Sequence, residues 1–120
     1  MNTVALVLVG LIAVIHVYFM ILEAFLWRTP RGMKIFNTDQ AFADRSAALA
    51  ANQGLYNGFL AAGLFWSLVA ADPVGFQTRV FFLGCVIVAG VFGAATVSRR
   101  IFFVQGLPAL ITLVLVLLSR

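Results

Sequence analysis

Seven polar or ionisable side chains interrupt otherwise apolar stretches of this sequence. They are His16 and Glu23 in the first stretch, Asn52, Gln53, Tyr56 and Asn57 in the second, and Gln105 in the last. His16 and Glu23 are seven residues apart, which is two helical turns, so both belong to one face of a helix. A carboxyl and an imidazole on one face, accompanied by amides, can hold a proton or a cation and hydrogen-bond a ligand. The spacing therefore predicts a polar ligand site.

Each of these side chains also has a structural explanation. Amides and imidazoles form hydrogen bonds that hold helices together within a membrane. Glu23 can extend its carboxyl toward water or pair with Arg28, five residues further on. We favour a site because packing alone does not require four amides, a carboxyl and an imidazole, and polar groups in lipid are costly.

Other chemistries have less support in the sequence. A catalytic zinc site uses three protein ligands, whereas His16 and Glu23 supply two, so no metal site is predicted. The sequence lacks GxSxG, HExxH and P-loop motifs, and nothing in it identifies a cofactor. Cys85 is the single cysteine and lies among apolar residues, so we interpret it as a packing residue.

The stretches that carry these residues are too apolar for a soluble protein. The 120-residue chain is 63% hydrophobic and 10% charged, whereas soluble domains are about 45–50% apolar and about 25% charged. So short a chain has too little interior to hide this apolar surface from water. Its net charge of +4 comes from basic residues in short connections, which does not favour nucleic acid as a partner. The expected partner is membrane lipid.

Four apolar stretches are long enough to cross a membrane as helices. They cover residues 4–27, 46–71, 80–98 and 101–118, each near or above the roughly 20 residues that a spanning helix needs. The alternation typical of a membrane β-barrel is absent. We therefore predict an all-α fold, an integral membrane four-helix bundle that forms a single transmembrane domain.

The distribution of Lys and Arg predicts the orientation of this bundle. The first and third connections hold Arg28, Arg31, Lys34, Arg45, Arg99 and Arg100, and the opposite side holds Arg79 and Arg120. Because basic connections stay in the cytoplasm, both termini are expected outside. The stretch 35–44 between the first two helices mixes apolar and acidic residues, which indicates an interfacial turn or short amphipathic helix at the cytoplasmic surface.

Depth along the helices separates the polar residues into two layers. Counted from the cytoplasmic boundary, one layer on the order of 7–11 Å deep holds Glu23, Asn52, Gln53 and Gln105. His16 and Asn57 lie deeper, at about 17 Å. We expect a cytoplasm-facing pocket in which Glu23 faces Asn52 or Gln53 and Gln105, with His16 facing inward near Asn57. Pro108 lacks a backbone N–H and should loosen the helix around Gln105 and Gly106, as at transporter binding sites.

Small residues recur every four positions on two of the predicted helices. They are Gly54, Gly58 and Ala62 on the second helix, and Cys85, Ala89 and Gly93 on the third. Such rows let helix backbones approach closely. We expect packing within the chain, with a homo-oligomer as the alternative.

Four sequence stretches resemble a known family. HVYFMILEAFLW, ANQGLYNGFLAAGL, FFLGCVIVAGVFGAATVS and FVQGLPAL are similar to the small bacterial membrane proteins grouped as domain of unknown function 1304. The resemblance covers almost the whole chain and implies a multi-pass protein of the bacterial inner (cytoplasmic) membrane, with no implied activity. The matching stretches contain all six candidate ligand-binding residues, His16, Glu23, Asn52, Gln53, Asn57 and Gln105.

Two classes of function fit these residues. The first is a protein that binds or transports a small polar or amphipathic molecule from the cytoplasmic side, with Glu23 as proton or cation partner. The second is a membrane-embedded enzyme acting on a lipid-soluble substrate, with Glu23 or His16 as general acid or base. A structural subunit of a membrane complex is a further alternative. No motif identifies the ligand.

Overall fold

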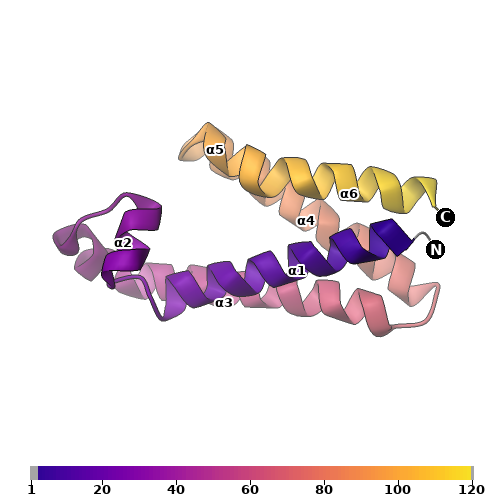
Figure 1. Cartoon of the computed structure of the whole chain (residues 1–120), viewed down its shortest axis with the longest axis horizontal. Helices are drawn as coiled ribbons and strands as arrows, with labels where there is room; N and C mark the ends of the chain where they lie inside the picture. The colour runs from indigo at the N-terminus through magenta and orange to yellow at the C-terminus, as the bar shows by residue number, and fades with distance from the viewer. Residues whose placement is uncertain (1–2, 120) are drawn as a thin grey trace. The chain divides into compact units, whose positions relative to one another are not determined.

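The computed structural model describes residues 3–119, and all regular structure in that range is helical. The elements in order are α1 (Thr3–Ala24), α2 (Pro30–Phe36), α3 (Gln40–Val69), α4 (Val74–Thr96), α5 (Arg99–Ile101), the π-helix η1 (Phe102–Gly106) and α6 (Leu107–Leu118). Figure 1 shows these helices and the short connections that join them. The prediction of an all-α fold is confirmed for the described residues.

Three helical segments within residues 3–119 are long and apolar enough to cross a membrane. They are Thr3–Ala24, Val74–Thr96 and Arg99–Leu118, and they match three of the predicted spans. The remaining helix, α3, has 30 residues, but its hydropathy is lower because it carries four amide side chains and charged residues in its first turns. The span predicted over residues 46–71 and the predicted orientation therefore stay predictions.

The chain divides into two units, which we describe separately. The amino-terminal unit is residues 14–61 and contains the second half of α1, all of α2 and most of α3. The carboxy-terminal unit contains residues 3–13 and 62–119 of the described chain, including α4, α5, η1 and α6.

In the amino-terminal unit, α1 and α3 pack closely because α3 presents glycine to α1. A Cβ atom on Gly54 would lie 3.0 Å from the carbonyl oxygen of Met20 and 3.1 Å from the backbone nitrogen of Ala24. A Cβ on Gly58 would lie 2.8 Å from the sulfur of Met20. A side chain at either position would crowd α1, so glycine favours this close approach. The prediction that Gly54 and Gly58 serve packing within the chain is confirmed.

The connection between α1 and α3 contains a helix with clear boundaries. Thr29 is the N-cap of α2, and its hydroxyl accepts the backbone N–H of Gly32 at 3.2 Å. Asn37 ends α2 in the left-handed conformation, with φ of 55°, which asparagine adopts more readily than most residues. Asp39 then accepts the Phe42 N–H at 2.8 Å in the first turn of α3. The predicted interfacial stretch 35–44 is thus the end of α2, a turn and the start of α3.

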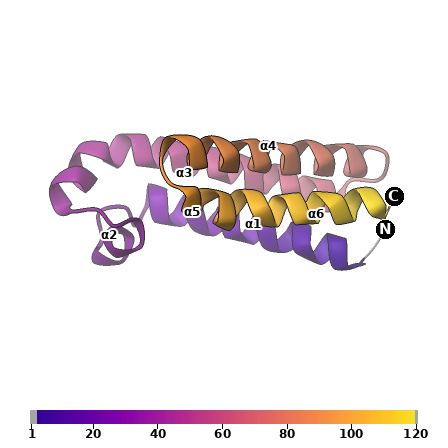
Figure 2. The same ribbon diagram turned by 90° about the horizontal axis from the view of Figure 1, so that it is seen from above.

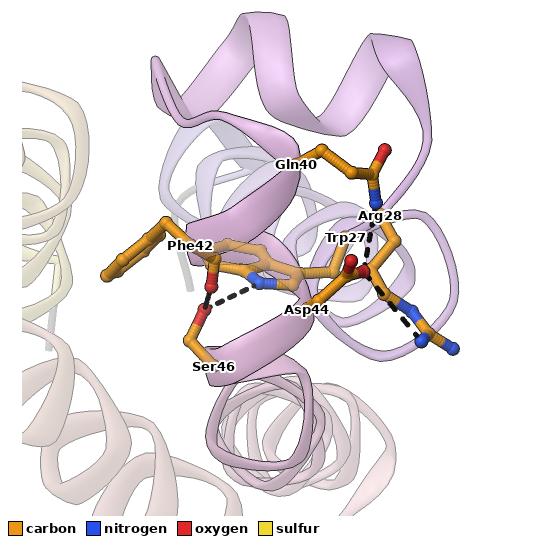
Figure 3. A network of polar contacts seen from close by, with 6 residues as sticks. All are labelled: Trp27, Arg28, Gln40, Phe42, Asp44 and Ser46. Carbon is orange, nitrogen blue, oxygen red and sulfur yellow. Dashed lines mark hydrogen bonds and ion pairs between the residues drawn. The ribbon is translucent and has the colours of Figure 1, made fainter.

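A polar network joins the start of α3 to the connection that follows α1 (Figure 3). The indole N–H of Trp27 donates to the Ser46 hydroxyl at 3.0 Å, and that hydroxyl donates to the Phe42 carbonyl at 2.7 Å. The Trp27 ring also packs on Phe36 of α2, with 4.9 Å between ring centroids. These contacts fix α2 against α3.

In the carboxy-terminal unit, α4 packs against the segment formed by α5, η1 and α6 (Figure 2). A Cβ on Gly90 of α4 would lie 2.6 Å from the Cα and the nitrogen of Gly106. In η1 the Leu107 N–H bonds to the Phe102 carbonyl, five residues earlier. This wider turn lies directly before Pro108, which confirms the predicted departure from regular α-helix around Gly106.

The prediction that Arg79 lies in the connection before residue 80 is wrong. The helix α4 begins at Val74, and Asp72 accepts the Phe76 N–H at 3.1 Å in its first turn. Arg79 is therefore helical, and its side chain is 3% exposed. Its guanidinium donates to the Ser67 carbonyl at 2.6 Å, near the end of α3, where carbonyls lack helical partners and favour a cation.

Candidate functional site

A carboxyl and an amide meet between α1 and α3 in the amino-terminal unit. The side-chain N–H of Asn57 donates to Oε1 of Glu23. Asn57 is 6% exposed and Glu23 is half-buried. Gly54 lies beside the pair, since a Cβ there would be 3.2 Å from the Cβ of Glu23. The close approach that Gly54 permits therefore brings Asn57 within hydrogen-bonding reach of the carboxyl.

This partner differs from the predicted one, in which Glu23 faces Asn52 or Gln53. Helix side chains lean toward the N-terminus of their own helix. The Glu23 side chain thus leans back along α1, which brings its carboxyl to the residue one turn beyond Gln53 on antiparallel α3. Asn52 and Gln53 are exposed on α3 and make no side-chain hydrogen bond within the described chain.

His16 lies two turns before Glu23 on α1 and is 1% exposed. Its ring contacts Phe19 edge to face, with 5.4 Å between centroids. A buried imidazole in a helix that is apolar enough to span a membrane is a candidate for proton transfer or ligand contact.

Gln105 belongs to the carboxy-terminal unit and lies within η1. π-Helical turns occur frequently at functional sites because they displace side chains from regular helical positions. Gln105 remains a candidate by sequence and by this local geometry.

The sequence analysis did not anticipate the contact between Trp27 and Ser46, which are the last residue of the predicted span 4–27 and the first residue of the predicted span 46–71. The available signal was the pair of helix-start motifs, Thr29-Pro30 and Asp39-Gln40, which indicate two helix starts instead of one.

A second surface feature is an apolar groove along one face of α4. Its lining residues are Val80, Phe81, Gly84, Cys85, Val88, Ala89 and Phe92. The lining is almost wholly apolar. Among the described residues, no group of three His, Cys, Asp or Glu side chains could hold a metal ion. The pair of Glu23 and Asn57 is thus the site with the clearest chemistry.

Together, these features define a class of small helical protein with membrane-span-like helices and a carboxyl–amide pair between two helices. Residues 10–117 match the family described as "Protein of unknown function (DUF1304)". The chain belongs to that family, and the resemblance seen in the sequence is confirmed. The chain is 28% identical over 116 residues to the uncharacterized protein YpaA of Lactococcus lactis subsp. lactis (strain IL1403), covering 95% of this chain and 97% of that protein. No solved structure matches the chain.

Proposed function

We propose that this protein is a four-pass protein of the bacterial inner membrane, with both termini outside. In this proposal α3 also crosses the membrane, in addition to the three helical segments named above. Its 30 residues correspond to about 45 Å of helix at 1.5 Å per residue, which exceeds the roughly 30 Å hydrocarbon thickness. The hydrogen bond from Asn57 to Glu23 supports this assignment, because it satisfies polar groups that lower the hydropathy of α3.

The proposed function is to bind a small polar or amphipathic molecule taken up from the cytoplasmic side. In an oligomer, the protein would transport this molecule. The observation that carries the proposal is the hydrogen bond between Asn57 and Glu23, formed within helices otherwise rich in apolar residues. A carboxyl held by one amide can accept further hydrogen bonds, so it suits a ligand with a cationic or N–H group. Glu23 is the proton or cation partner, and Asn57 orients its carboxyl.

The remaining candidates have supporting roles in this proposal. His16 forms the deeper end of the site, and Asn52 and Gln53 line its approach from the cytoplasm. Gln105, in the displaced turn of η1 in the carboxy-terminal unit, stays a predicted ligand-binding residue. Such a site combines apolar walls with few polar groups, which is typical of small-molecule sites.

Binding of tetraphenylphosphonium, a lipophilic cation, tests this function. We expect saturable binding to the full chain in lipid nanodiscs, measured by equilibrium dialysis of the radiolabelled cation. Glu23→Gln should weaken binding at least tenfold, because the neutral amide keeps the shape and removes the charge.

Asp44→Asn is the matched control, since Asp44 is an exposed carboxyl in the same unit and this change should leave binding within twofold of the wild type. Equal binding by the wild type and Glu23→Gln would contradict a cation role for Glu23.

A further inference from the structure

The connection between α1 and α3 carries an excess of positive charge at its surface. The exposed basic residues of this connection and of the first turns of α3 are Arg28, Arg31, Lys34 and Arg45. Arg28 lies 4.0 Å from the carboxylate of Asp44, and Asp39 is engaged by the Phe42 N–H. Within the described chain no ion pair involves Arg31, Lys34 or Arg45. Three cations are therefore available to an external anion.

Apolar side chains accompany these cations on the same helical faces. In α2, Arg31, Lys34 and Ile35 are exposed within one turn of each other, whereas Gly32 is buried on the other side. In α3, Arg45 shares a face with Phe42 and Leu49, which are 44% and 76% exposed. Each helix thus presents a cation beside an exposed apolar side chain.

The underlying helices are held in place by their own contacts. The Trp27 indole bridges α2 and α3 through Phe36 and Ser46, as Figure 3 shows for the contact with Ser46. Gly32 packs tightly against the backbone of Leu26, so a Cβ on Gly32 would clash with the Leu26 carbonyl oxygen. The charged and apolar faces are therefore presented by an ordered element.

We propose that Arg31, Lys34 and Arg45, with Ile35, Phe42 and Leu49, form a surface that binds the headgroups of anionic phospholipids. The cations pair with lipid phosphates, and the apolar side chains enter the boundary between headgroups and acyl chains. The exposed apolar side chains favour a lipid surface over an acidic protein or a nucleic acid, whose charged groups offer them no apolar contact. This surface differs from the proposed site at Glu23 in the charge of its ligand, because it binds anions and the Glu23 carboxyl binds a cation.

Trp27 provides a reporter for lipid at this surface. The chain has two tryptophans, so Trp66→Phe leaves Trp27 as the single fluorophore, in contact with α2. The full chain is reconstituted in phosphatidylcholine vesicles that contain equal small fractions of nitroxide-labelled phosphatidylglycerol or nitroxide-labelled phosphatidylcholine. We expect two- to five-fold stronger quenching of Trp27 by the labelled phosphatidylglycerol at about 0.1 M salt, and loss of this preference at about 1 M salt, where charges are screened.

Charge removal tests which residues are responsible. In the triple variant Arg31→Gln/Lys34→Gln/Arg45→Gln, both labelled lipids should quench Trp27 equally. Each single variant should lose part of the preference for phosphatidylglycerol. Arg99→Gln/Arg100→Gln removes two exposed charges outside this surface and should keep the preference. An unchanged emission maximum of Trp27 verifies that the variants fold.

Equal quenching by both lipids in the wild type would overturn the proposal, as would a preference that survives the triple variant. Binding of soluble polyglutamate without a lipid preference would assign the surface to an acidic protein instead. Because Glu23→Gln leaves this surface intact, failure of cation binding at Glu23 and failure of lipid binding are separate results.

Discussion

Replacement of Gly90 by alanine should destabilise the protein by about 1–3 kcal/mol, the usual cost of overpacking. The new Cβ would lie 2.6 Å from the Cα and the nitrogen of Gly106. Both atoms are backbone, so no side-chain rotation can relieve the contact, and α4 must move away from η1. The free energy of unfolding can be measured by titrating the full chain in mixed micelles with sodium dodecyl sulfate and following its helical circular dichroism.

Gly84→Ala is the matched control on the same helix. A Cβ on Gly84 would meet no heavy atom of another part of the described structure within 4 Å. Alanine should therefore be neutral or slightly stabilising through its helix propensity. If Gly90→Ala proved as stable as Gly84→Ala, the close packing of α4 on η1 would be contradicted.

The pair of Glu23 and Asn57 should show a coupling free energy of about 1–3 kcal/mol in a double-mutant cycle with alanine. Hydrogen bonds between membrane helices average about 0.6 kcal/mol. A larger value is expected here because the acceptor is a carboxyl and because Asn57, at 6% exposure, has little access to water. The same unfolding titration measures all four proteins of the cycle.

Asn52 supplies a control of the same residue type on the same helix. It is exposed and makes no side-chain hydrogen bond in the described structure, so the cycle of Glu23→Ala with Asn52→Ala should give a coupling near zero. Coupling to Asn52 that equals or exceeds the coupling to Asn57 would contradict the observed pairing.

The extent of the helices could be predicted where apolar residues run without interruption. Predicted spans 4–27, 80–98 and 101–118 correspond to segments that the structure makes helical. The helix ends were less predictable because hydropathy does not report capping. The helix α4 includes Arg79, whose charge suggested a connection, since the Ser67 carbonyl accepts from its guanidinium. The start of α3 at Gln40 likewise follows from the Asp39 cap and not from hydropathy.

The candidate site could be predicted only in part. Residue type and helical periodicity identified Glu23 and Asn57 as candidates, and Gly54 as a point of close approach. The choice of Asn57 over Gln53 as partner depends on the direction in which both side chains lean and on the contact of Gly54 with Met20. Neither the side-chain direction nor this contact can be obtained by counting residues from each membrane boundary.

Access to the site from the cytoplasm is the central claim, and cysteine labelling tests it most directly. In a Cys85→Ser background, Gln53→Cys introduces a single thiol on the exposed side of α3, one turn from Asn57. Leu55→Cys, which is exposed in the structure and expected to face lipid, is the control. We predict that a membrane-impermeant maleimide labels Gln53→Cys in inside-out vesicles only, that tetraphenylphosphonium slows this labelling, and that Leu55→Cys does not react. Labelling of Gln53→Cys only from the outside, or no labelling from either side, would contradict the account.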